Sequence, residues 1–355
     1  MTARRQGRGP TRADVARLAG TSTAVVSYVV NDGPRPVAAA TRARVLGAVN
    51  QLGYRPDRIA RALAARRTET VGLVVADITN PFMSDVARAV EAAASARDHT
   101  VLLANSAVDR QREQVLIEQL LDRRVDGLIL LAVGPGAATV RELNRSGVPV
   151  VALDRPVGGL RAATVTVDNV GGAAEATMHL AGHGHRRIAC ISGPPPLWPT
   201  AEREKGWSTA VAEMGLGRGS CPVVHASIDR GAGYEAAVRL LNRTRPPSAV
   251  FVTTDEQAFG VLRAAVDTGR QVPDDVAVVS FDGISQAAFS VPGLSSVVQP
   301  VDQMAAKAVD LLLDGPPERV VFPVELLTRG SCGCPDPVVR AKRRTPPPRG
   351  TAGGP

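Results

Sequence analysis

The residues best suited to binding a small molecule come directly after short apolar segments of the chain. They carry amide, aromatic, carboxylate and hydroxyl groups, and they are Asn80, Phe82, Asp154, Thr254, Asp255 and Asp282. Arg203 adds a guanidinium group near the start of a segment with helical spacing. Guanidinium and carboxylate groups together bind hydroxyl-rich ligands through charge-assisted hydrogen bonds. These residue types therefore indicate a binding site for a polar small molecule.

The same sequence lacks the common motifs of catalysis and of metal binding. It contains no Gly-x-x-x-x-Gly-Lys-Ser/Thr loop, no Gly-x-Gly-x-x-Gly after a predicted strand and no Gly-x-Ser-x-Gly turn. We interpret His183-Gly184-His185 as structural, and Cys332-Gly333-Cys334 lacks the two further ligands that a zinc site needs. We therefore expect no catalytic residue, no cofactor and no metal. An enzyme is the alternative if cleft groups with shifted pKa values stand in nucleophile–base geometry.

The elements that must position these residues alternate between apolar strands and amphipathic helices over residues 68–335. A first series of strands is predicted at 71–75, 101–103, 127–131 and 148–153, and a second at 164–167, 188–192, 222–225, 250–253 and 276–281. Helices are predicted at 82–97, 111–122, 138–146, 171–181, 202–214, 232–241 and 257–268. This alternation predicts an α/β fold with two doubly wound parallel-sheet lobes. Because such sheets bind ligands at the carboxyl ends of their strands, the cleft between the lobes is the expected site.

Three segments near the end of the body complete this prediction. They are a strand at 295–298, a helix at 301–313 and a strand at 320–326, and we expect them to cross back to the first lobe. Residues 336–355 form a basic tail rich in proline and glycine, and this composition predicts disorder. The tail has no leucine heptad from which a coiled coil could form.

A small helical head over residues 11–56 precedes the body. Thr11 is placed to cap a first helix, Gly20 to end it, and Ser22 to cap a second helix over residues 23–31. A third helix is predicted from about Thr41 to Leu52. A helix, a tight turn, a second helix and a supporting helix form the helix-turn-helix arrangement, which places its second helix in the major groove of DNA.

The distribution of charge agrees with a DNA-binding head. Residues 1–67 contain 13 basic and 3 acidic residues, whereas residues 68–335 contain 24 basic and 30 acidic ones. Aromatic residues make up only 3% of the chain, which disfavours single-stranded nucleic acid because that binding depends on base stacking. No apolar run approaches the ~18 residues of a membrane span, and the four cysteines fit a reducing cytoplasm. We expect a cytoplasmic protein that binds double-stranded DNA and no membrane.

Several longer stretches of the chain match one protein family. In the head they are Asp14-Val15-Ala16-Arg17-Leu18-Ala19-Gly20, Val26-Ser27, Val29-Val30-Asn31 and Leu52-Gly53-Tyr54-Arg55-Pro56. In the body they are Ile78-Thr79-Asn80-Pro81-Phe82, Gly184-His185-Arg186-Arg187-Ile188 and Val279-Ser280-Phe281-Asp282. The chain resembles the lactose/purine repressor (LacI) family of transcription factors from about residue 11 to 334. The resemblance implies a body related in fold to periplasmic sugar-binding proteins.

The resemblance also implies which residues contact DNA. The base-reading positions of the second helix are Thr23, Ala24 and Tyr28. Phosphate contacts that set the register fall on Ser22, Ser27, Asn31, Thr41 and Tyr54. The chain departs from the family at Val25, where threonine is usual, and at Thr21, where an apolar residue is usual.

Residues 57–67 match the hinge helix of the family. That helix folds when two copies of the chain meet over the centre of an operator. Arg58 and Arg61 would lie beside phosphates, and Leu63 matches the leucine that wedges into the minor groove. An apolar wedge unstacks one base step and bends the duplex. The resemblance thus implies a homodimer on a near-palindromic operator.

For the cleft, the resemblance implies that Arg203 and Asp282 hydrogen-bond the effector. Phe82 or Trp198 offers a face for a sugar ring, and Met83 stands where a second aromatic residue is common. These residues favour a repressor whose operator affinity is controlled by a sugar or sugar-like metabolite. A solute-binding protein for transport is the main alternative on this fold, and the basic head opposes it.

Overall fold

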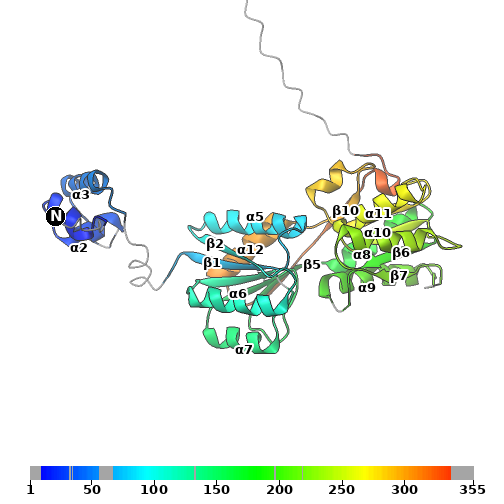
Figure 1. Cartoon of the computed structure of the whole chain (residues 1–355), viewed down its shortest axis with the longest axis horizontal. Coiled ribbons are helices and arrows are strands. Elements are labelled where there is room, and N and C mark those ends of the chain that lie inside the picture. Colours follow the sequence, from blue (N-terminus) through cyan, green and yellow to red (C-terminus); the bar gives the residue numbers. More distant parts are fainter. Residues whose placement is uncertain are drawn as a thin grey trace, which may run out of the picture. The chain divides into compact units, whose positions relative to one another are not determined.

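A computed structural model describes residues 9–31, 33, 35–55, 67–131, 133–195, 197–217 and 219–336 (Figure 1). The chain divides into two compact units, Met1–Glu69 and Thr70–Pro355. The predicted hinge residues Arg58, Arg61 and Leu63 and the tail from residue 337 lie outside the described residues. Within the described ranges, no helix is both long and apolar enough to cross a membrane.

The first unit contains the three helices that the sequence predicts. They are α1 (Arg12–Leu18), α2 (Thr23–Val30) and α3 (Ala39–Leu52), which begins two residues before the predicted start. Thr11 and Asp14 form a reciprocal capping box at α1, and Gly20 has a left-handed φ of 60° after it. Val15, Val26 and Val45 are fully buried and join the three helices into one small core.

The second unit begins with a lobe built on a six-stranded parallel sheet in the order β2-β1-β3-β4-β5-β11. The strands are β1 (Thr70–Val75), β2 (Thr100–Asn105), β3 (Gly127–Leu131), β4 (Val150–Leu153), β5 (Ala163–Val167) and β11 (Arg319–Phe322). The helices are α5 (Pro81–Ser95), α6 (Arg110–Asp122), α7 (Ala137–Ser146) and α12 (Val301–Leu313). Ile129 of β3 faces the core under α5 and α12, whereas Leu128 and Leu130 face the core under α6 and α7. Buried side chains on both faces explain why these strands are continuous apolar runs.

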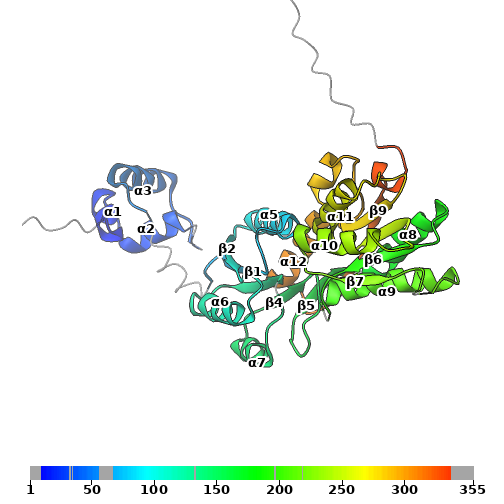
Figure 2. The ribbon, with the colours of Figure 1, turned by 45° about the vertical axis from the view of Figure 1, so that its right-hand side comes forward.

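The second lobe repeats this plan with the strand order β7-β6-β8-β9-β10-β12 (Figure 2). Its strands are β6 (Ile188–Ser192), β7 (Val223–His225), β8 (Ala249–Val252), β9 (Ala277–Asp282), β10 (Ser295–Val298) and β12 (Glu325–Leu327). Its helices are α8 (Asn169–Gly182), α9 (Trp198–Glu213), α10 (Arg230–Leu241) and α11 (Asp255–Asp267), with short 3-10 turns at Ser285–Phe289 and Gly330–Cys332. All strand pairs in this sheet are parallel except β10 with β12.

The chain passes between the lobes three times, after β5, β10 and β11. The expectation that all three final segments cross back to the first lobe is wrong for two strands. Segment 295–298 is β10 of the second lobe, and segment 320–326 is two strands in different lobes. Pro323 explains this break, because it has no N–H to donate to a sheet and it stands between β11 and β12.

Candidate functional site

The reading face of the head is formed by the first turn of α2. Thr23 and Ala24 are both exposed there, and the Ser22 hydroxyl accepts a hydrogen bond from the Val25 N–H at 3.3 Å. Tyr28 is half-buried one turn later. The side chains that the sequence assigns to base reading therefore share the first two turns of one helix, and its N-terminus favours nearby phosphate.

The side chains assigned to phosphate contact have mixed environments. Asn31 is exposed and its Nδ2 donates to Ser27 Oγ at 3.2 Å, and Thr41 is half-buried at the start of α3. Tyr54 differs because it is buried in the core of the head. The described arginines of the head are all exposed, and they are Arg12, Arg17, Arg35, Arg42, Arg44 and Arg55. The surface of the head therefore carries exposed positive charge, which binding to a DNA backbone requires.

A pocket of about 410 Å³ lies between the two lobes of the second unit. Its walls come from the segments that follow β1, β2, β3 and β4 in the first lobe and β6, β7, β8 and β9 in the second. Seven of the nine residues assigned to the effector line it, namely Asn80, Phe82, Met83, Asp154, Arg203, Thr254 and Asp282. The volume lies within the range of about 300–1,000 Å³ that is typical of small-molecule sites.

The two remaining candidates, Asp255 and Trp198, do not line this pocket. Asp255 is fully buried inside the second lobe, where its carboxylate accepts hydrogen bonds from Ser296 Oγ at 2.6 Å and the Ile284 N–H at 2.8 Å. Trp198 is the first residue of α9, which begins four residues earlier than predicted, and its neighbours Leu197 and Pro199 face the pocket instead. Asp255 thus holds the loop after β9 in place, and the pocket residue Asp282 is the last residue of β9.

Asp154 and Asp282 occupy equivalent positions in the two lobes, at the ends of β4 and β9. Both have positive φ angles, 72° and 122°, that residues other than glycine rarely adopt. Burial is the main cause that raises the pKa of Asp154, against the opposing charges of Arg203 and Arg155. Burial likewise raises the pKa of Asp282 to about 7, against the opposing charge of Arg203. Strained, desolvated carboxylates are characteristic of ligand sites.

Arg203 links the pocket to two of the crossings between the lobes. Its Nη1 donates to Asp282 Oδ1 at 2.8 Å and to the Thr253 carbonyl at 2.7 Å, and its Nε donates to Asn169 Oδ1 at 2.8 Å. Asn169 begins α8 directly after the crossing from β5, and Gln299 in the crossing from β10 donates to Asp282 Oδ1 at 2.9 Å. The hydrogen bonds of Arg203 and Asp282 therefore include one residue from each of two connections between the lobes.

The first-lobe wall contains a residue that sequence reasoning missed. Arg155 lines the pocket between Asp154 and Glu113, and Glu113 accepts hydrogen bonds from the Val133 N–H at 2.8 Å and the Gly134 N–H at 3.2 Å. Among the described residues, Asp154 Oδ1 and Arg155 Nη2 are buried without a hydrogen-bond partner. Buried polar atoms of this kind require partners, which a polar ligand supplies. The position of Arg155 directly after Asp154 was the signal for it.

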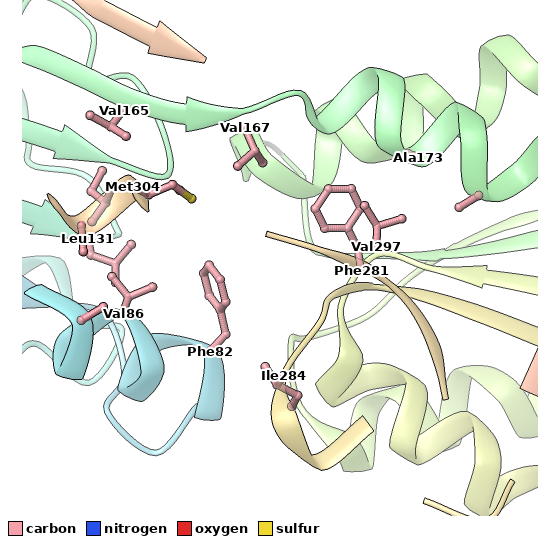
Figure 3. Close-up of a cluster of buried hydrophobic side chains, with 14 of the residues drawn as sticks. Phe82, Val86, Leu131, Val165, Val167, Ala173, Phe281, Ile284, Val297 and Met304 are labelled. Carbon is pink, nitrogen blue, oxygen red and sulfur yellow. The ribbon is translucent and has the colours of Figure 1, made fainter. Parts of the chain in front are cut away.

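The further missed residues at the pocket follow the same rule of strand ends. They include Asp77 after β1 and Ser227, Ile228 and Asp229 after β7. Figure 3 shows Phe82 on α5 facing the boundary between the lobes, with Phe281 and Ile284 of the second lobe across it. The pocket itself is lined by apolar residues such as Met83, Leu131 and Leu197 together with charged groups at the strand ends, which is the composition expected for a site that binds a ring with hydroxyl substituents.

The structure adds neighbours that the local sequence of the cysteines does not show. His179 of α8 and His183, the C-cap residue of that helix, lie beside Cys332 and Cys334, so that one potential ligand atom from each residue falls within 4.8 Å of the others. Two side chains able to bind a metal therefore come from a segment about 150 residues away. Spacing along the chain could not show this, because the contact depends on how the last segment folds back onto α8.

Comparisons with known proteins agree with both units. The family of "Bacterial regulatory proteins, lacI family" matches residues 11–57, and the "Periplasmic binding protein-like domain" matches residues 177–332. Catabolite control protein A of Priestia megaterium is 37% identical over 84% of this chain and 90% of its own length. The Escherichia coli ribose operon repressor is 36% identical over 85% of this chain and 92% of its own length. A solved complex of the transcriptional regulator CelR with cellobiose has 33% identity and a TM-score of 0.68 over 91% of this chain and 99% of that one.

Proposed function

This chain belongs to the LacI family of bacterial transcriptional regulators, and from that premise we propose that it is a repressor controlled by a sugar bound between its lobes. The observation that carries the proposal is the pocket lined by strand ends of both lobes, with buried carboxylate and guanidinium atoms that lack partners among the described residues. The helix-turn-helix unit supplies the DNA-binding surface. Because chromosomal DNA is its target, we expect the protein to be in the cytoplasm.

The groups in the pocket favour a sugar over a charged metabolite. Both signs of charge are present, with Asp154 and Asp282 beside Arg155 and Arg203. A hydroxyl can donate to a carboxylate and accept from a guanidinium at the same time, so a polyol satisfies such pairs without adding net charge. The names of two relatives include sugars: one is the ribose operon repressor of Escherichia coli, and the other is a complex of the regulator CelR with cellobiose. The described residues that line the pocket include no histidine or cysteine.

Control of DNA binding follows from the connections between the lobes. A sugar that bridges Asp154 in the first lobe and Asp282 in the second favours one relative position of the lobes. Arg203 and Gln299 transmit this preference to the first and second crossings through their hydrogen bonds. In a homodimer, the lobe position sets the spacing of the two hinges (residues 57–67), and Leu63 can enter the minor groove only at the matching spacing. Allosteric coupling of this type amounts to about 1–3 kcal/mol.

The test measures operator binding of the full-length protein by fluorescence anisotropy, with DNA from the region upstream of its own gene. Pentoses, hexoses and disaccharides are first screened by thermal shift, because a ligand that binds the folded state raises Tm. The bound sugar should then change the operator Kd about 5- to 150-fold.

A pair of variants makes this test specific. Asp154→Asn should abolish the response to the sugar with little loss of stability, because asparagine tolerates the positive φ at this position. Asp122→Asn changes an exposed carboxylate at the end of α6 and should respond like the wild type. An undiminished response of Asp154→Asn would refute the proposed site.

A further inference from the structure

A compact group of four metal-binding side chains lies in the second lobe, apart from the pocket. The residues are His179 in the last turn of α8 and His183, the C-cap residue of that helix, together with Cys332 and Cys334 near the end of the described chain. His179 Nε2 lies 3.2 Å from Cys332 Sγ and 3.7 Å from Cys334 Sγ, and His183 Nε2 lies 3.5 Å from Cys334 Sγ. Both cysteines are free thiols.

These distances match the edges of a tetrahedral zinc site. With Zn–S near 2.3 Å and Zn–N near 2.05 Å, tetrahedral angles place a nitrogen and a sulfur about 3.6 Å apart. The three N···S distances of 3.2, 3.7 and 3.5 Å lie close to that value. One hydrogen bond does not account for all of these contacts, because His179 Nε2 lies near two sulfur atoms and has either one proton to donate or one lone pair to accept with. A cation at the centre satisfies all four ligand atoms together.

The local fold brings the ligands together from opposite ends of the second lobe's sequence. His179 and the C-cap residue His183 are four residues apart at the end of α8, which brings their rings together, and the ring centroids are 4.7 Å apart. Gly333 between the cysteines has a φ of 92°, which a side chain would strain, and this turn directs both thiols to the same side. Cys332 is only 1% exposed, so the site is closed on the protein side.

We propose that His179, His183, Cys332 and Cys334 bind one zinc ion as a Cys2His2 structural site. Four protein ligands leave no open position for a reacting water, which distinguishes a structural site from a catalytic one. An S2N2 donor set in this geometry selects zinc over magnesium or calcium, which prefer oxygen ligands. The ion would fasten the chain's last described segment to the C-terminal end of α8, about 20 Å along the helix from Asn169, which bonds the pocket residue Arg203.

The first measurement is the metal content of the untagged full-length protein, purified without chelator from zinc-supplemented cells. Elemental analysis should give about one zinc per chain, and removal by a chelator should lower Tm until zinc chloride restores it. Replacement by Co²⁺ should give the intense visible absorption of tetrahedral cobalt with thiolate charge transfer. These readouts do not depend on DNA binding or on the proposed sugar site, so the two proposals fail separately.

Variants connect the metal to these residues. Cys334→Ser and His183→Ala replace the two ligands nearest the surface, and each should lose most of the bound zinc. His225→Ala is the matched control, because His225 pairs with Glu204 outside the cluster and its loss should leave the zinc content unchanged. A wild-type protein that stays free of zinc after reduction and zinc addition would overturn the proposal, and so would full zinc content in the Cys334→Ser/His183→Ala double variant. If Cys332 and Cys334 form a disulfide and the reduced protein still takes up no zinc, the zinc proposal is overturned as well.

Discussion

Replacing Arg203 with alanine should destabilise the second lobe strongly, because it leaves a buried carboxylate without its cation. Arg203 is 2% exposed and Asp282 is 6% exposed, and the guanidinium lies 3.8 Å from the centre of the Phe281 ring. After the substitution, the Gln299 amide is the one side-chain donor to Asp282 that remains among the described residues. Removal of one partner from a buried ion pair costs about 3–5 kcal/mol, and we expect the loss to fall in this range.

The cost should come from the uncompensated charge, and a double-variant cycle separates this from lost packing. Asp282→Asn alone keeps the Arg203 bonds to Asn169 and Thr253, so it should cost about 1–3 kcal/mol. The double variant Arg203→Ala/Asp282→Asn leaves neither member of this ion pair as an unpaired charge. Its free energy of unfolding should therefore exceed the additive expectation by about 1–3 kcal/mol.

Urea denaturation followed by tryptophan fluorescence is the assay. Both tryptophans of the chain, Trp198 and Trp207, are in α9, so the signal reports on the second lobe. Arg239→Ala removes an exposed arginine from α10 of the same lobe and should change stability by less than about 0.5 kcal/mol. A loss below about 1 kcal/mol for Arg203→Ala, or strict additivity in the cycle, would refute the reasoning.

Three further predictions concern the site, the hinge and the packing. Sugar affinity should increase as pH rises through about 7, because a ligand hydroxyl that donates to Asp282 stabilises the charged carboxylate, whose pKa is raised to about 7. Calorimetry at about pH 6 and about pH 8 checks this. The variant Asp282→Asn should remove the pH dependence. Leu63→Ala should weaken operator binding far more than nonspecific DNA binding in anisotropy titrations, and equal losses would exclude a wedge. Gly206→Ala should cost about 1–3 kcal/mol or more in urea denaturation, because a Cβ there would lie 2.2 Å from the Val170 carbonyl, whereas Gly182→Ala meets nothing within 4 Å and should be neutral or slightly stabilising.

The sequence was sufficient to predict most of the fold, because its central strands are buried on both faces and most of the described helices have a side-chain cap. Segments 127–131, 188–192, 295–298 and 301–313 coincide with β3, β6, β10 and α12. Prediction failed where one apolar run serves two sheets, since the run 320–326 reads as one strand unless Pro323 is treated as a break. It also failed at the start of α9, because Pro199 reads as a loop residue although proline is favourable in the first turn of a helix.

The residues of the candidate site were likewise predicted only in part. Strand ends identified Asn80, Asp154 and Asp282 because parallel strands bring their carboxyl ends to one edge. The same rule could not distinguish Asp255, which turns inward to Ser296 and Ile284, from Thr254, which faces the pocket one residue earlier. Such choices depend on side-chain direction and on partners far apart in the chain, and the Cys2His2 cluster depends on them as well.

The two equivalent aspartates differ in a way that gives the lobes unequal roles. Asp282 is already bound by Arg203 and Gln299, and through them its position is fixed to two crossings. Asp154 has no such partner for its Oδ1 among the described residues, although it occupies the same place in the first lobe. A sugar that satisfies Asp154 while contacting Asp282 therefore ties the less constrained carboxylate to the rigid network. The free energy gained by pairing Asp154 is available only when the lobes are close enough for one ligand to reach both, and this requirement is what makes lobe position depend on the ligand.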